Sequence, residues 1–191
     1  MNASDGPKER LIKAALELFY QQGYQATGIN QLIKEAGVAK ASFYDHFEDK
    51  EDLYVAYLER RHDNWTNACR QRVSMEETSA DRIKTLFSYL TEWMKKDGYR
   101  GCAFLNSAAE FTDPKSKVRK VVSWHKDSLR TYIKELVQSH YKNEDLSEVE
   151  IEDLANEVYV LIDGSIIASQ VYHDPWPIAR AARAAEKLLG L

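Results

Sequence analysis

Residues 37–53, GVAKASFYDHFEDKEDL, carry an apolar side and a polar side on what we expect to be a short helix. Phe43 and Phe47 are four residues apart, so they fall on one side of a helix and should pack inward. Lys40 and Tyr44 then fall on the outward side. Such side chains donate hydrogen bonds to phosphate oxygens and to base edges, and lysine is a common partner of guanine O6 and N7. The pattern is typical of a helix that lies in the major groove of DNA.

The residues before this stretch complete a helix-turn-helix. Residues 27–36, TGINQLIKEA, predict a short helix with Thr27 as its N-cap. Gly37 tolerates the positive φ that a tight turn requires, and the second helix should follow over roughly 39–46. A longer helix should precede both and begin at Pro7, because proline suits the first helical turn. Together these elements predict a three-helix unit.

Residues 8–53 resemble the DNA-binding domain of TetR-family transcriptional regulators. The residues that carry the resemblance are Phe19, Gly23-Tyr24, Thr27, Gly37-Val38, Phe43-Tyr44, His46-Phe47, Lys50 and Leu53. The resemblance implies a regulator that binds a double-stranded DNA operator and is not an enzyme. The expected DNA-binding residues are Thr27, Asn30, Gln31, Lys40, Ala41, Ser42, Tyr44, His46 and Lys50.

Three residues of the predicted second helix admit more than one interpretation. Tyr44 could join a small aromatic core, but the core already has its aromatic rings on the other side, so we favour contact with DNA. His46 either contacts a phosphate or interacts with the carboxyl end of the helix. Asp45 departs from the family, in which many relatives carry a neutral or basic residue. It points away from DNA, pairs with Lys50, or accepts a hydrogen bond from a cytosine amine.

The rest of the chain predicts helices and no strands. We expect an all-α fold of about nine helices, with an N-terminal three-helix helix-turn-helix domain and a C-terminal helical ligand-binding and dimerisation domain. The expected boundaries are 1–50 for the first domain and 51–191 for the second, in which 51–72 form a linking helix. Expected helix starts lie at Asp49, at Asp113-Pro114 and at Ser147, which makes a capping box with Glu150.

The DNA-binding interpretation requires a homodimer, because one helix-turn-helix reads only a few base pairs. Two copies read a palindrome when their recognition helices are about 34–36 Å apart. We expect the dimer surface on the last two predicted helices, at Val158, Leu161, Ile162, Ile166 and the apolar side of 178–189. The alternative is that these residues form core within one subunit.

The resemblance also implies a small-molecule inducer that binds the C-terminal domain and changes the spacing of the two DNA-binding helices. Such an inducer must bind the two spacings with different affinities. The candidate ligand-binding residues are Phe87, Trp93, Phe104, Asn106, Trp124, His125, Tyr159, Asp163 and Gln170. Aromatic residues at helical spacing are usually core, so each is weighed against that interpretation. Asp163 interrupts an apolar run and is either a pocket anchor or a group at the dimer interface.

Cys102 is a candidate redox sensor. It follows Gly101 in a segment that resembles one found in family members that respond to reactive electrophiles, which would make the inducer an electrophile. The alternative is a buried, inert thiol. Repression is what the family mostly implies, with activation by the same fold as the alternative.

The composition limits the other function classes. The net charge of −4 implies no broad basic surface, so DNA binding must rest on few phosphate contacts. No apolar run approaches the roughly 18 residues of a membrane span, and the N-terminus lacks a signal-peptide pattern. We therefore expect no membrane association and a cytoplasmic location.

Two alternatives from other function classes are weaker. A Cys102–His125–Asp163 triad can be assembled on paper, but no local nucleophile signature supports it. No zinc spacing or glycine-rich phosphate loop occurs, so no metal and no cofactor are expected. A helical dimeric adaptor that binds protein would not need an exposed Lys40 and Tyr44.

Overall fold

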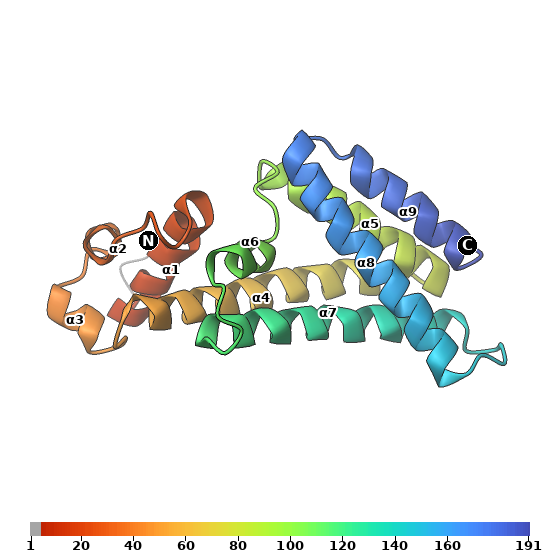
Figure 1. Cartoon of the computed structure of the whole chain (residues 1–191), viewed down its shortest axis with the longest axis horizontal. Helices are drawn as coiled ribbons and strands as arrows, with labels where there is room; N and C mark the ends of the chain where they lie inside the picture. The colour runs from red at the N-terminus through yellow and green to blue at the C-terminus, as the bar shows by residue number, and fades with distance from the viewer. Residues whose placement is uncertain (1–4) are drawn as a thin grey trace. The chain divides into compact units, whose positions relative to one another are not determined.

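The computed structural model describes residues 5–191, and within this range the chain forms nine α-helices and no strand (Figure 1). The helices are α1 (Pro7–Gln22), α2 (Ile29–Ala36), α3 (Lys40–Tyr44), α4 (Lys50–Ser74), α5 (Ser79–Lys96), α6 (Ala103–Glu110), α7 (Lys117–His140), α8 (Glu148–Tyr172) and α9 (Trp176–Leu188). The all-α prediction is therefore confirmed.

The described residues divide into two compact units. The N-terminal unit contains the residues up to Trp65 together with Ala103–Trp124, and the C-terminal unit contains Thr66–Cys102 together with His125–Leu191. Helices α4 and α7 contribute residues to both units. The predicted boundary at residue 50 is a functional division and stays a prediction. Over residues 5–191, no helix combines the length and the hydrophobicity that crossing a membrane requires.

The first helix supplies much of the core of the N-terminal unit. Leu11 and Phe19 of α1 are 0% and 2% exposed, because apolar residues recur at helical spacing along it. Pro7 stands in its first turn, as predicted. The helix ends where Gly23 adopts a φ of +83° and its N–H donates to the Phe19 carbonyl. Helix α1 packs against α2 and α3, so it holds the helix-turn-helix from behind.

The start of α2 differs from the prediction. Gly28, not Thr27, is the N-cap residue, and no side chain caps the helix. Thr27 is fully buried, and its hydroxyl donates to the Gly23 carbonyl at 2.7 Å. The N-cap prediction was wrong because a threonine before a helix can satisfy its hydroxyl in the core as well as at the helix end.

The other predicted helix starts have mixed outcomes. The Asp49 carboxylate accepts a hydrogen bond from the Asp52 N–H at 2.8 Å, and Ser147 with Glu150 forms a complete capping box. Both of these predictions are confirmed. The predicted start at Asp113 was wrong, because α7 begins at Lys117 and the Asp113 carboxylate instead accepts from the Lys115 N–H in a local turn.

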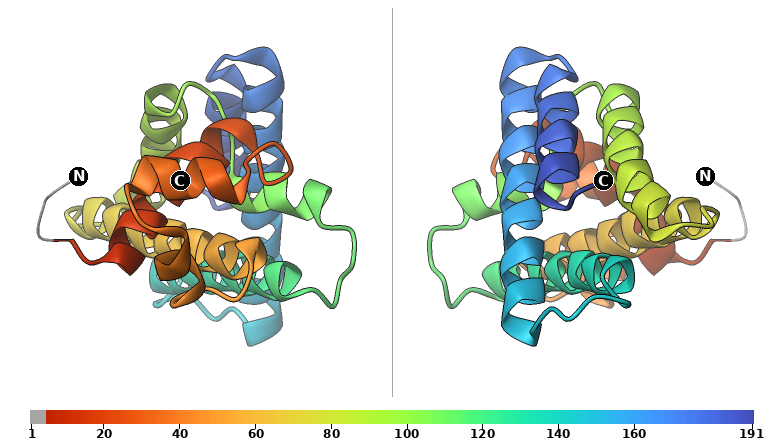
Figure 2. Two further views of the ribbon diagram at one scale, coloured as in Figure 1. Left: turned by 90° about the vertical axis from the view of Figure 1, so that its left-hand side faces the viewer. Right: turned by 90° about the vertical axis from the view of Figure 1, so that its right-hand side faces the viewer.

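Helices α8 and α9 lie side by side in the C-terminal unit (Figure 2). Val158, Ile162 and Ile166 of α8 are at most 3% exposed, so they form core within the subunit. Their predicted place on the dimer surface was therefore wrong. The exposed apolar residues of α8 are others, namely Val149, Val160, Ile167, Val171 and Tyr172.

Candidate nucleic-acid interface

Helix α3 presents two chemically different sides. Phe43 is 0% exposed and Phe47, which follows the helix, is 5% exposed, so the inward side is confirmed. Tyr44 is 50% exposed although its ring lies edge-on to Phe43, with 5.1 Å between the centroids. Lys40, Ala41 and His46 are also exposed, and Ser42 is half-buried. The outward side of α3 can therefore reach a groove or a phosphate, while the phenylalanines fix the helix from beneath.

Helix α2 adds two more polar side chains to the predicted set. Asn30 and Gln31 are exposed in its first turn. No side chain caps the amino end of this helix, and the first backbone N–H groups of a helix are a suitable partner for a phosphate. Thr27 behaves differently, since its side chain is buried and faces the protein. A contact between Thr27 and DNA stays a prediction.

The turn between α2 and α3 is held by α1. Gly37 has a φ of +61°, in the left-handed region that glycine adopts without strain. Arg10 of α1 donates from Nη1 to the Gly37 carbonyl at 3.0 Å. Arg10 was not predicted from the sequence, because it lies 27 residues from Gly37 and no local pattern indicates the contact. The arginine therefore ties the turn to α1.

The Lys50 ammonium faces the protein. Its Nζ donates to the carbonyls of Tyr24 and Thr27, at 2.9 and 3.0 Å, and lies 3.9 Å from the centre of the Tyr24 ring. Burial lowers the pKa of Lys50 from its ordinary value, and the nearby Glu110 carboxylate acts in the opposite direction. Lys50 thus holds the connection between α1 and α2, and its predicted phosphate contact remains a prediction.

Asp45 makes no ion pair with Lys50, because the lysine is occupied by backbone carbonyls. Asp45 is exposed directly after α3. Two other carboxylates nearby share one cation, since Lys117 of α7 reaches Asp49 at 3.2 Å and Asp52 at 2.5 Å. The hydrogen bond from Lys117 lowers the pKa of Asp52. This pairing offsets part of the acidity that follows α3.

The predicted ligand-binding residues are distributed over both units. In the N-terminal unit, Phe104 is buried and Asn106 is half-buried. In the same unit, the centroids of the Trp124 and His62 rings are 4.0 Å apart. The other six, all in the C-terminal unit, are Phe87, Trp93, His125, Tyr159, Asp163 and Gln170. A role in ligand binding stays a prediction for all nine.

Asp163 of α8 anchors a mostly buried polar cluster in the C-terminal unit. Its carboxylate accepts from Lys126 of α7 at 2.8 Å, and both side chains are less than one-fifth exposed. Burial, followed by the Asp163 charge, raises the pKa of Tyr159 one helical turn earlier. Lys126 was missed from the sequence because its partner lies 37 residues away. Charged groups in such a cluster could orient a polar ligand.

The remaining predicted ligand residues have structural partners of their own. Phe87 and His125 are buried, and the Trp93 indole N–H donates to the Asp97 carboxylate at 2.9 Å. The Gln170 side chain fills the space beside Gly101, where an added Cβ would stand 2.3 Å from its Oε1. Phe87 and His125 are therefore core residues, whereas Trp93 and Gln170 are half-buried.

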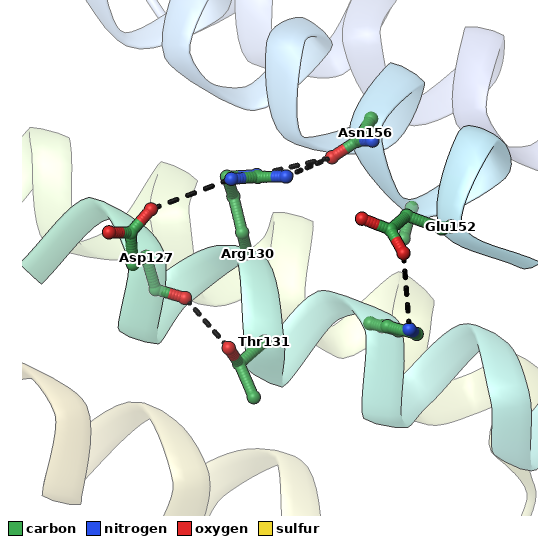
Figure 3. Close-up of a pocket in the computed structure, with 7 residues that line it drawn as sticks. Asp127, Arg130, Thr131, Glu152 and Asn156 are labelled. Carbon is green, nitrogen blue, oxygen red and sulfur yellow. Dashed lines mark hydrogen bonds and ion pairs between the residues drawn. The ribbon is translucent and has the colours of Figure 1, made fainter. Parts of the chain in front are cut away.

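Two surface pockets of the C-terminal unit lie elsewhere. The first, of about 310 Å³, is polar and lies between α7 and α8 (Figure 3). There Arg130 donates to the Asn156 side chain at 3.0 and 3.1 Å and reaches Asp127 at 3.5 Å, while Lys134 pairs with Glu152. Its cations are already matched by carboxylates and an amide. None of the predicted ligand residues lines it.

The second pocket is a shallow, mainly apolar groove of about 630 Å³ between α8 and α9. Its apolar lining is Val160, Leu161, Ala184 and Leu188, and Asp153, Asn156 and Glu157 also line it. It too contains none of the predicted ligand residues. Its apolar lining suits another protein surface better than a polar small molecule.

The two cysteines are both buried. Burial raises the pKa of the Cys69 thiol to about 12, so this thiol stays protonated and inert at neutral pH. Cys102, which immediately precedes α6, is 6% exposed. Among residues 5–191, no cluster of three or more His, Cys, Asp or Glu could hold a metal ion.

Comparison with known proteins connects these features to a family. Residues 11–57 match the family described as bacterial regulatory proteins, tetR family, and residues 79–185 match the tetracyclin repressor-like C-terminal domain. The transcriptional activator FasR of Mycolicibacterium smegmatis is 33% identical over 98 residues, which are 50% of this chain and 45% of FasR. The chain therefore spans less than half the length of that relative.

Two further relatives cover more of the chain. The transcriptional repressor ComR of Escherichia coli is 24% identical over 166 residues, which are 85% of this chain and 79% of ComR. The crystal structure of SCO4454, a TetR-family transcriptional regulator from Streptomyces coelicolor, superposes with a TM-score of 0.84 and 25% identity. That match covers 96% of this chain and 88% of SCO4454. Since both the helix-turn-helix and most of the later helices are matched, the chain belongs to the TetR family of transcriptional regulators.

Proposed function

We propose that this protein is a homodimeric repressor that binds a palindromic DNA operator and is released by a small-molecule inducer. The observation that carries the proposal is the outward side of α3, where Lys40, Ala41 and Tyr44 are exposed above the buried Phe43. An exposed lysine and tyrosine on a helix held by a rigid core suit base edges and phosphates. An adaptor that binds protein would have no need of them.

The homodimer is supported by the exposed apolar face of α8. Val160 is 65% exposed, Ile167 47% and Val171 70%, and they follow each other at intervals of seven and four residues. Such spacing places them on one side of a helix. The adjoining groove between α8 and α9 continues this apolar surface. Two copies that bring these faces together would remove the patch from water, which is the main driving force for association.

Repression is proposed over activation on the general character of the family. The relatives include the activator FasR and the repressor ComR, so the sign of regulation needs its own test. A reporter gene placed behind the operator should be silent when the protein is present and active when the gene for the protein is deleted. The opposite result would assign an activator.

The inducer is proposed to bind the C-terminal unit, where the Lys126–Asp163 pair offers buried charge. If the inducer is an electrophile, Cys102 is the thiol that would react, because the Cys69 thiol has a pKa of about 12. Mild treatment with a thiol-reactive electrophile should then release the operator from wild-type protein and not from Cys102→Ser. Equal release from both proteins would exclude Cys102 as the sensor.

The proposal as a whole is tested by selecting bound DNA from a random pool with the purified full chain. We expect the selected sequences to share an inverted repeat, because two copies of α3 related by a two-fold axis read the same bases on opposite strands. Enrichment of a single asymmetric motif would contradict the homodimer. No enrichment at all would contradict specific DNA binding.

A further inference from the structure

Two side chains of opposite charge, each from another helix, form hydrogen bonds with the backbone of the connection between α1 and α2. Residues 23–28 lie between the helices, so their backbone N–H and C=O groups lack the regular partners of a helix. Glu110, the last residue of α6, accepts hydrogen bonds from backbone N–H groups of this connection. Lys50, the first residue of α4, donates hydrogen bonds to its carbonyls. All three segments belong to the N-terminal unit.

Glu110 accepts hydrogen bonds from two successive backbone amides. Its Oε2 lies 3.0 Å from the Tyr24 nitrogen and 3.2 Å from the Gln25 nitrogen. Glycine at position 23 makes room for the carboxylate, since an added Cβ would stand 3.1 Å from Oε1. A carboxylate is a strong acceptor for such amides. The contact joins residues 86 positions apart, so it fixes the connection against a different part of the chain.

Lys50 binds the carbonyl groups of the same backbone segment. Its ammonium bridges the carbonyls of Tyr24 and Thr27, at 2.9 and 3.0 Å. Thr27 precedes Gly28, the N-cap of α2. The backbone that leads into the amino end of α2 is therefore bound at its N–H groups by the Glu110 carboxylate and at its C=O groups by the Lys50 ammonium. We call this pair of side chains the clamp.

The end of α6 is itself firmly placed. Phe111 is the next residue. The centroid of its ring lies 4.7 Å from that of Tyr24 and 5.4 Å from that of Tyr54. Ser107 of α6 shares a 2.8 Å hydrogen bond with the Tyr54 hydroxyl. Arg119 of α7 donates to the Phe111 carbonyl at 3.3 Å. Because contacts with Tyr54 of α4 and Arg119 of α7 hold the end of α6, Glu110 can position the connection rather than follow it.

We propose that Glu110 is a positioning residue for DNA binding, which acts with Lys50 by holding the α1–α2 connection so that the amino end of α2 and the side chains that follow meet the DNA. This inference rests on the proposed operator binding. It also gives Lys50 a role different from a phosphate contact. Glu110 never touches DNA in this role, and its effect on affinity passes through the backbone of Tyr24 and Gln25.

The sign of the Glu110 effect separates positioning from simple charge. DNA is an anion, so deleting a carboxylate that only contributes charge should tighten binding or leave it unchanged. If Glu110 positions the connection, Glu110→Ala should instead weaken operator binding by roughly tenfold, in proportion to two lost charge-assisted hydrogen bonds. Glu110→Gln retains an acceptor oxygen and should recover part of the loss. Glu59→Ala, which removes an exposed acid of α4 in the same unit, is the matched control.

Lys50 is tested by the salt dependence of binding. A lysine that contacts a phosphate contributes about 0.9 to the slope of log affinity against log salt. A lysine that only positions the backbone contributes nothing to that slope. We therefore expect Lys50→Met to weaken binding by roughly tenfold with an unchanged slope. A slope reduced by about one would assign Lys50 to a phosphate and remove it from the clamp.

The experiment measures two quantities on the full chain, operator affinity by fluorescence anisotropy and amide hydrogen exchange at Tyr24 and Gln25 without DNA. The expected result is faster exchange at both amides and weaker affinity in Glu110→Ala, with neither change in Glu59→Ala. Unchanged exchange would remove the clamp. Faster exchange with unchanged or tighter affinity would remove its role in DNA binding. Failure of the wild-type chain to bind any selected DNA would refute the proposed function instead, and the exchange data would still decide whether the clamp exists.

Discussion

At the scale of single residues, the helix-turn-helix separates side chains that hold the fold from side chains that are free to read DNA. The spacing of Phe43 and Phe47 was sufficient to predict their burial, because four residues are about one helical turn. Thr27 was not predictable, since the same residue type serves at helix starts and in cores. Lys50 was not predictable either, because its acceptors are backbone carbonyls more than twenty residues away.

Lys40→Ala and Tyr44→Ala should each weaken operator binding by about tenfold or more. The free energy of unfolding should change by less than about 0.5 kcal/mol in Lys40→Ala, because this side chain is exposed. It should fall by about 1 kcal/mol in Tyr44→Ala, whose ring packs edge-on against Phe43. Anisotropy titrations and urea unfolding measure the two effects. Lys95→Ala, at an exposed lysine of α5, is the control. Wild-type affinity in both α3 variants would contradict the assigned interface.

Thr27→Val should destabilise the chain by about 1 kcal/mol, because the Gly23 carbonyl would lose the donor that the buried Thr27 hydroxyl supplies. Thr27→Ser retains the hydroxyl and should recover part of that loss. Urea unfolding of the two variants measures the difference. If Thr27→Val unfolds at the same urea concentration as the wild type, the hydrogen bond from Thr27 to Gly23 contributes nothing to stability.

At the scale of elements, the exposed side of α8 could not be predicted from its sequence pattern. Apolar residues occur on every side of this helix, so periodicity could not tell the core side from the exposed side. Ile162 proved to be core and Val160 proved to be exposed, although they are two residues apart. Only the packing of α8 against α9 and α5 assigns the two sides.

Val160→Glu should convert the proposed dimer to monomers, since a charge at the centre of an apolar interface is left desolvated and unpaired. Sedimentation velocity measures the mass directly. Met75→Glu is the matched control, because Met75 is an exposed apolar residue outside α8. An intact Val160→Glu dimer, or equal dissociation of both variants, would contradict the assigned surface.

Ion pairs between helices of the N-terminal unit should make stability depend on pH at the acidic end. Hydrogen bonds from Lys117 and from Arg60 lower the pKa values of Asp52 and Glu9 below their ordinary 3.8 and 4.5. A lowered carboxylate pKa contributes stability above the unfolded pKa, and that stability is lost as pH falls through the folded pKa. We expect the urea midpoint to fall between about pH 5 and pH 3, and to fall less steeply in Lys117→Met. Identical pH profiles would contradict this assignment.

At the scale of the whole molecule, helical periodicity was enough to predict an all-α fold, and the ordered motif of residues 8–53 was enough to identify the family. Regulators of this family bind DNA and are not enzymes, so the expectation about enzymatic activity is confirmed. The contacts that position the helix-turn-helix could not be predicted from the sequence. Glu110 and Tyr24 are 86 residues apart, and no local pattern indicates that they meet.

The central claim is that two copies of α3 read one operator together. It is tested most directly by comparing the affinity of the full chain for the selected palindrome with its affinity for a single half-site, at one salt concentration. We predict a complex with the mass of one dimer on the palindrome and at least about a hundredfold weaker binding to the half-site, because the second recognition helix loses its target. Equal affinity for the palindrome and the half-site would contradict the claim.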